Sequence, residues 1–261
     1  MTILGDYWRG RTDAIPSSAL VALLGEFGVS VTGARSALSR LTRRRLLARS
    51  RNGRRTFYRL TPGALRQIDV GAERIFTFGA GEKWDGRWSL LAFSVAEPDR
   101  HLRSRLRNSI RFLGFAPLYD GLWISPSDRM DSIAGLMAEL GIDRFTFFRA
   151  DAAPGSLATL ESAWDLETLR AEYEAFIARF SPVRQRLDPA RALVDRTHLM
   201  DAWRSFPRLD PDLPDSLLPA DWPRARARDL FTESYERLEP VARARFEEVL
   251  AGAAREARLY P

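Results

Sequence analysis

The stretch RSRNGRRTFYRL, from Arg49 to Leu60, places five arginines and no carboxylate around a central Asn-Gly pair. Asn-Gly between two runs with apolar residues is the strongest short-range signal for a β-hairpin. We expect strands over 46–48 and 56–60, with Asn52 and Gly53 as the turn. Like charges repel on so small an element, so the stretch indicates an anionic partner that offsets this repulsion.

Two helices joined by a short turn are expected before this hairpin. Ser17 or Ser18 can cap a helix that extends to residue 27, and Gly28 stands where a left-handed residue ends it. Thr32 is the expected cap of the second helix. The sequence over 2–8 predicts a short first helix. Because it is short, we expect it to contribute less than the two following helices to the core that they form with the hairpin.

The second helix of the pair has an apolar face and a basic, hydroxylated face. Ala34, Ala37, Leu38 and Leu41 recur at spacings of three and four, which predicts that they are buried. A helix-turn-helix followed by a hairpin is a winged helix-turn-helix, whose second helix enters the DNA major groove while the hairpin tip meets phosphates or a minor groove. The residues expected to contact DNA are Thr32, Arg35, Ser36, Ser39, Arg40, Arg43, Arg44, Arg51, Asn52, Arg54 and Arg55.

The charge distribution supports a localised anionic partner. Residues 27–68 contain eleven arginines and no Asp or Glu, whereas the whole chain has a formal net charge of +6, so the remainder is net negative. The alternative is a basic face that is merely solvated. Double-stranded DNA is the partner that this segment favours, with an affinity that falls steeply with salt.

Composition excludes several other classes of protein. The 261 residues include no cysteine, which excludes disulfides and thiolate metal sites. No apolar run approaches the length of a membrane span and no signal peptide is apparent, so we expect a cytoplasmic protein. The hydrophobic fraction of 45% is sufficient for two or three packed domains.

We predict a multidomain α+β protein with domains over 1–67, 87–153 and 154–261 and a glycine-punctuated connector with a short helix over 68–86. The central domain has the order β-α-β-β-α-β, which is typical of a ferredoxin-like sandwich. Its expected strands are 88–95, 118–119, 121–124 and 145–148, and its expected helices are 101–113 and 130–140.

The last domain is expected to be helical. An apolar stripe runs through 166–180, and further helices are expected over 193–206, 227–238 and 241–259. A proline-rich segment, 206–223, connects the helices expected over 193–206 and 227–238. Its prolines predict an ordered extended path rather than a helix.

Five segments resemble the PaaX family, the repressors of phenylacetate catabolism. They are VTGARSALSRL (31–41), NGRRTFYRLT (52–61), WDGRWSLLAFSV (84–95), LRNSIRFLGFAPLYDGLWISP (106–126) and HLMDAWRSFPRLDPDLPDSLLPADWP (198–223). The resemblance implies a repressor with an N-terminal winged helix-turn-helix, a central domain similar to small CRISPR-associated nucleases and a helical C-terminal domain. It further implies a homodimer on an operator, released by an acyl-CoA effector, typically phenylacetyl-CoA.

The sequence contains no motif of catalysis or of a resident cofactor. There is no P-loop, Gly-x-Ser-x-Gly or His-Glu-x-x-His, and His101 and His198 lie in separate domains. We therefore expect no enzyme, no catalytic residue and no metal site. Two alternatives remain: a metal-dependent nuclease using Glu97 or Asp99, although both follow the first central strand in the wrong register, and a basic module that binds an acidic protein.

Candidate effector-binding residues cluster in the last of the five segments. Arginine recognises phosphate bidentately, so Arg204 and Arg208 are candidates for coenzyme A phosphates, unless they pair with nearby aspartates. Aromatic rings can line an apolar pocket for an aryl group or simply form core. His198, expected at a helix start, is either a ligand contact or a structural hydrogen-bonding residue. The full set is His198, Trp203, Arg204, Arg208 and Trp222, with Phe206 as a further aromatic.

Overall fold

The computed structural model describes residues 1–80, 84–94, 100–153, 162–182 and 188–259. The chain divides into two compact units. The first unit comprises Met1–Thr77, Phe176–Arg204 and Arg226–Pro261, and the second comprises Phe78–Ala175 and Ser205–Ala225. In the described part of the chain, no helix is long and apolar enough to cross a membrane.

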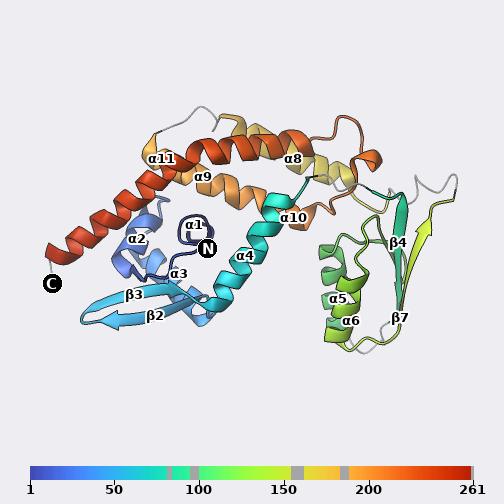
Figure 1. Cartoon of the computed structure of the whole chain (residues 1–261), viewed down its shortest axis with the longest axis horizontal. Coiled ribbons are helices and arrows are strands. Elements are labelled where there is room, and N and C mark those ends of the chain that lie inside the picture. The colour runs from blue at the N-terminus through green and yellow to red at the C-terminus, as the bar shows by residue number, and fades with distance from the viewer. Residues whose placement is uncertain (81–83, 95–99, 154–161, 183–187, 260–261) are drawn as a thin grey trace. The chain divides into compact units, whose positions relative to one another are not determined.

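The first unit combines the N-terminal elements with C-terminal helices (Figure 1). Its elements are α1 (Thr2–Tyr7), β1 (Ile15–Pro16), α2 (Ser17–Gly25), α3 (Val31–Arg43), β2 (Leu47–Asn52), β3 (Arg55–Leu60), α4 (Pro62–Thr77), α9 (Pro189–Trp203), the end of α8 (Leu166–Phe180) and most of α11 (Arg224–Leu259).

The helix α1 and the residue after it pack against the C-terminal helices of the first unit. Leu4, Tyr7 and Trp8 are all buried. The ring of Tyr7 stacks on Phe246 of α11 at 4.8 Å between centroids. These contacts are with C-terminal helices that are distant in the sequence, α9 and α11, so α1 contributes to a core that the sequence did not predict.

The helices α2 and α3 form where the sequence predicts them, but their caps differ. The first begins at Ser17 after Pro16 and has no side-chain cap. The second is capped by Ser30, whose hydroxyl accepts a hydrogen bond from the backbone N–H of Gly33 at 3.1 Å, so the expectation of Thr32 as cap is wrong. Gly28 has φ +74°, as expected for a left-handed residue between the two helices.

The hairpin β2–β3 is longer than predicted and turns one residue later. Asn52 pairs with Arg55, which leaves Gly53 and Arg54 as the two-residue loop. Gly53 takes φ +58°, a conformation that glycine adopts at little cost. With β1 the hairpin forms a three-stranded antiparallel sheet in the order β1-β3-β2.

Residues 62–77 form one helix of 16 residues, α4, which begins before the predicted connector and is longer than the short helix expected within it. Glycine is tolerated inside it, because a single helical glycine costs only about 1 kcal/mol relative to alanine. Trp203 of α9 donates its indole N–H to the carbonyl of Ile75 at 3.3 Å. Tertiary contacts of this kind stabilise a segment that local propensity leaves undecided.

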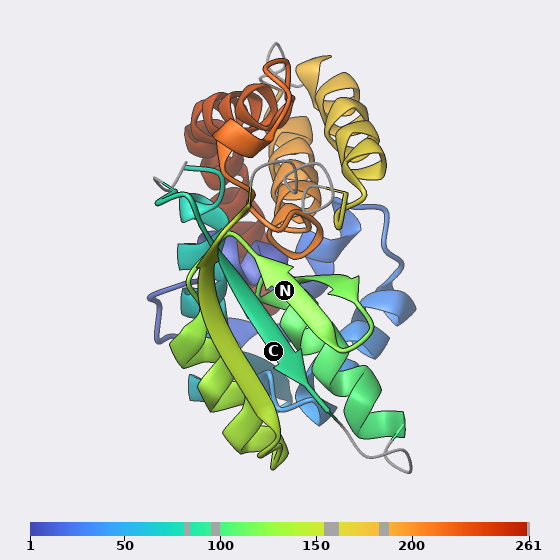
Figure 2. The same cartoon turned by 90° about the vertical axis from the view of Figure 1, so that its right-hand side faces the viewer.

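The second unit contains a four-stranded antiparallel sheet in the order β5-β6-β4-β7. This order confirms the ferredoxin-like arrangement predicted from the element sequence. The helices α5 and α6 cover one face of the sheet (Figure 1 and Figure 2). The elements are β4 (Arg87–Phe93), α5 (Arg100–Phe112), β5 (Ala116–Tyr119), β6 (Leu122–Ser125), α6 (Met130–Leu140) and β7 (Phe145–Asp151).

The core of the second unit lies between the sheet and these helices. Leu106 and Ile110 of α5 are fully buried, as their helical spacing predicts. They pack with Leu91 and Trp123 of the sheet and with Ile133 of α6. Alternation along the strands therefore places every second residue against the helices.

The C-terminal helices differ from the prediction at two prolines. A single helix, α11, spans 224–259 with Pro240 inside it, where two helices were expected. Leu238 and Ala242 on either side are fully buried, so packing maintains the helix despite the missing N–H of Pro240. Pro207 lies in a short helix, α10 (Phe206–Leu209), rather than in an extended path. A 3-10 turn, η2 (Asp215–Leu217), follows in the same segment.

Candidate nucleic-acid interface

The outward face of α3 carries the predicted polar residues. Ala34 and Leu38 are buried, and Ala37 and Leu41 are half-buried on the same side. The opposite face is therefore directed to solvent. Its exposed members are Thr32, Arg35, Ser36, Ser39, Arg40, Arg43 and, at the C-cap, Arg44.

The tip of the β2–β3 hairpin carries the second group of predicted residues. Arg51, Asn52, Arg54 and Arg55 are all exposed. The pairs Asn52–Arg55 and Arg51–Thr56 place these side chains at the closed end of the hairpin. The structure thus presents two basic surfaces in the first unit, one on α3 and one at the hairpin tip, which we call the α3 face and the hairpin tip.

The two carboxylates that flank the basic segment are engaged by other elements. Glu26, just before it, accepts two hydrogen bonds from Arg245 of α11 at 2.9 and 3.1 Å. Asp69, just after it, accepts a hydrogen bond from Arg9 at 2.7 Å. In the described part of the chain, no carboxylate pairs with Arg35, Arg40, Arg43, Arg44, Arg51 or Arg54. The positive charge of these six arginines is therefore available to an external anion.

Three of the five candidate effector residues belong to the first unit. His198 is exposed within α9, with its ring 5.9 Å from that of Phe27, and it does not begin the helix, because Asp188 caps α9. Trp203 is 1% exposed and stacks on Phe231 at 4.9 Å, which makes it a core residue. Arg204 pairs with Asp201 at 3.1 Å.

The other two candidates belong to the second unit. Arg208 is exposed on α10. Trp222 is half-buried, with its ring 6.3 Å from that of Tyr173 and beneath the guanidinium of Arg170 at 5.2 Å. Arg170 itself forms a bidentate pair with Asp221 at 2.9 and 3.0 Å.

A buried ionic cluster in the proline-rich segment was not predicted. Arg224 is 3% exposed and donates hydrogen bonds to Asp212 at 3.0 Å, to Asp215 at 2.6 Å and to the carbonyl of Leu213 at 2.7 Å. Asp210, which is also buried, lies 3.7 Å from the same guanidinium and accepts a hydrogen bond from Tyr173 at 2.5 Å. Burial raises the pKa of Asp210, and Arg224 opposes that shift. The cluster fixes the path of a segment that has little regular structure.

A second buried cluster links α1 to α9 and α11. The carboxylate of Asp6 accepts a hydrogen bond from the Tyr235 hydroxyl at 3.0 Å and lies 3.9 Å from the guanidinium of Arg196. The same guanidinium lies over the Tyr235 ring at 3.6 Å. Burial raises the pKa of Asp6 to about 6, although Arg196, Tyr235, Arg204 and the terminal amino group each lower it.

This raised pKa predicts a pH-dependent stability. A carboxyl whose pKa is higher in the folded state binds its proton more tightly there, so it stabilises the fold at low pH and loses that effect as pH rises through about 6. Relative to Asp6→Asn, which cannot titrate, the wild type should gain up to about 3 kcal/mol of unfolding free energy between pH 7 and pH 4. Urea unfolding of both proteins across this range measures the difference. A difference that stays constant with pH would contradict the burial of a titrating Asp6.

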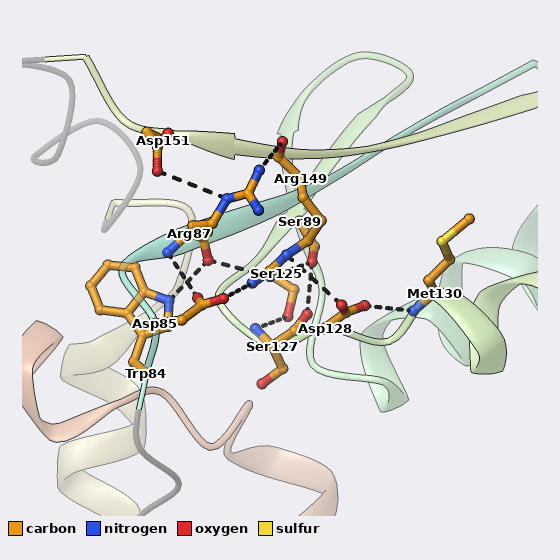
Figure 3. Close-up of polar contacts among 10 residues, drawn as sticks. All are labelled: Trp84, Asp85, Arg87, Ser89, Ser125, Ser127, Asp128, Met130, Arg149 and Asp151. Atoms are coloured by element: carbon orange, nitrogen blue, oxygen red, sulfur yellow. Dashed lines mark hydrogen bonds and ion pairs between the residues drawn. The ribbon is translucent and has the colours of Figure 1, made fainter.

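A polar cluster at one end of the central sheet is built around an arginine (Figure 3). Arg149 of β7 donates to the fully buried hydroxyl of Ser89 at 3.0 Å and to Asp85 at 2.5 Å. The Ser89 hydroxyl in turn donates to the carbonyl of Ser127 at 2.9 Å, after β6. These bonds tie β4, β7 and the segment after β6 together, which is a structural role.

The nuclease alternative gains no support from this domain. Glu97 and Asp99, its expected metal-binding acids, lie outside the described residues. Among the residues that are described, no group of three or more His, Cys, Asp or Glu side chains could hold a metal ion.

The chain matches three family models in succession. Residues 1–64 match a PaaX-like protein, residues 81–161 the PaaX protein central Cas2-like domain, and residues 164–248 the PaaX-like protein C-terminal domain. The transcriptional repressor PaaX of Escherichia coli K12 is 31% identical over 256 residues, which cover 93% of this chain and 80% of that protein.

A solved structure shares the fold. An uncharacterized protein from Mycobacterium tuberculosis has a TM-score of 0.65 with 24% identity, over 95% of this chain and 96% of that one.

Fold and surface together define a multidomain α+β protein with a basic N-terminal module and a Cas2-like central domain. The chain belongs to the PaaX family. The prediction that it is not an enzyme is confirmed, because the curated family member is a transcriptional repressor.

Proposed function

We propose that this protein is a DNA-binding transcriptional repressor. The observation that carries the proposal is the pair of exposed basic surfaces, the α3 face and the hairpin tip, which lie close to each other in the sequence. The name of the E. coli relative, a transcriptional repressor, supports the same function. In this proposal α2, α3 and the β2–β3 hairpin act as a winged helix-turn-helix.

The proposed binding mode follows from the chemistry of the two surfaces. An α-helix fits the major groove, so the α3 face meets base edges there, with Ser and Thr hydroxyls and arginines as donors. The hairpin tip meets phosphates or an adjacent minor groove, where arginine contacts contribute affinity more than sequence information. A homodimer would place two α3 helices on successive major grooves of a palindromic operator.

Hydroxyl-radical footprinting on the DNA upstream of the gene tests this mode. Two protected segments, centred about 10 base pairs or a multiple of that distance apart, are expected for a dimer. One protected segment would support the DNA-binding function but contradict the dimer. The function itself would be contradicted if no segment were protected at a protein concentration at which a control DNA-binding protein saturates its own duplex.

We further propose that an acyl-CoA thioester, phenylacetyl-CoA in the first instance, releases the protein from DNA. This part rests on the family. The candidate contact residues are His198 and Arg204 in the first unit and, considered separately, Arg208 and Trp222 in the second. The exposure of His198 and Arg208 is compatible with such a role. Trp203 is a weaker candidate, because its side chain is enclosed by Phe176 and Phe231.

The effector is expected to weaken operator binding, whereas free phenylacetate and free coenzyme A should not. Because binding linkage is reciprocal, operator DNA must weaken thioester binding by the same factor. Calorimetric titration of the thioester into free protein and into the protein–operator complex measures this factor. Equal affinities in the two titrations would contradict a role as inducer and leave DNA binding unaffected.

A further inference from the structure

The leading end of α3 exposes two valines. Val31, the first residue of the helix, is 52% exposed, and Val29, two residues earlier, is 36% exposed. Both residues are β-branched and apolar, and such residues are not favoured at the N-terminus of a helix. Val29 is the more covered of the two, and its side chain lies over Gly33 in the first turn of α3, whereas about half of Val31 remains open to solvent.

The surroundings of Val31 suit the edge of a base pair. Ser30 between the two valines uses its hydroxyl to cap the helix at Gly33. Thr32 and Arg35 beside it are exposed, and the first turn of α3 contains no acidic residue. This end of α3 thus offers methyl groups and the positive end of a helix dipole, without a carboxylate that would repel DNA.

Duplex DNA presents one apolar group in its major groove, the C5-methyl group of thymine. The N-terminal residues of a recognition helix are the ones that contact base edges. We propose that Val31 reads a thymine methyl group in the major groove, so that it selects thymine at one position of each half-site. This inference rests on the proposed DNA-binding function and assigns part of its specificity to one side chain.

Removing only the methyl group from DNA gives a direct test. Each thymine of the footprinted site is replaced in turn by deoxyuridine, which keeps the base pair and lacks the methyl group. At the contacted position, wild-type binding should weaken about fourfold, the factor for about 0.8 kcal/mol of lost apolar burial. Val31→Ala should bind the unmodified site about fourfold more weakly and should be insensitive to deoxyuridine at that position.

A control variant separates this contact from a general effect of losing a valine. Val70 of α4 is 69% exposed, and Val70→Ala should retain the full deoxyuridine profile of the wild type. Because Val31 is exposed and alanine favours helices, Val31→Ala should fold normally. If it shows the same deoxyuridine profile as the wild type, or if no position affects the wild type, the inference is wrong while specific DNA binding stands. If the wild-type protein instead binds unrelated duplexes as tightly as the footprinted site, both the proposed function and this inference are wrong.

Discussion

Replacement of Arg224 by methionine is expected to lower the free energy of unfolding by about 3–5 kcal/mol. Removal of one partner of a buried ion pair leaves the other charge uncompensated, which costs far more than the pair contributes as a whole. Asp210, 6% exposed, is the residue that bears this cost, whereas Asp215 is largely exposed and can be rehydrated. Methionine retains most of the apolar volume, so the change reports charge more than packing.

Urea unfolding followed by tryptophan fluorescence measures this loss, with Arg170→Met as the matched control. That variant removes a bidentate pair with Asp221, whose carboxylate is largely exposed and can be rehydrated, and should cost at most about 1 kcal/mol. Adding Asp210→Asn to Arg224→Met should restore part of the stability, because a neutral amide no longer needs a cation. A loss of under about 1 kcal/mol for Arg224→Met would show that the carboxylates do not depend on this arginine.

Replacement of Arg51 and Arg54 together by alanine is expected to weaken DNA binding ten- to a hundredfold at about 0.1 M salt. Each phosphate contact adds about 0.9 to the slope of log affinity against log salt, so the slope should become about 2 units less steep. Both side chains are exposed at the hairpin tip, so their removal should leave the fold unchanged. The preference for operator over scrambled DNA should persist, because phosphate groups are the same for every base sequence and contacts with them do not distinguish one sequence from another.

The control variant lowers the net charge of the protein by the same amount, but in the second unit. Arg129 and Arg144 are exposed in the second unit, and their double replacement by alanine should change the salt slope little. Titrations at four or more salt concentrations separate the two variants. Equal effects would mean that net charge, rather than the hairpin tip, governs binding.

Local signals in the sequence predicted most of the elements but not all of their ends. The hairpin at Asn52-Gly53 was predicted, yet the loop begins one residue later, because the register is set by cross-strand pairs as well as by the turn. Ser30 and Thr32 are both suitable caps, and only the geometry at Gly33 distinguishes them. The break expected at Pro240 is absent because burial on both sides outweighs one missing hydrogen bond.

The α3 face and the hairpin tip could be predicted because both arise from short-range patterns. Helical spacing separates the buried side of α3 from its exposed side, and the turn positions the arginines around it. The clusters at Arg224 and Asp6 could not be predicted in this way, since they join residues whose contacts depend on tertiary packing. The sequence signal for the first was present only as three closely spaced aspartates, Asp210, Asp212 and Asp215, among the prolines of 206–223.

The most direct test of the proposed function is a fluorescence-anisotropy titration of the protein against its own upstream promoter DNA and a scrambled duplex of equal composition. Both titrations use physiological salt, at which non-specific electrostatic binding is weak. The proposal predicts that the promoter binds at least about a thousandfold more tightly than the scrambled duplex. Equal affinities for the two duplexes would contradict a sequence-specific repressor.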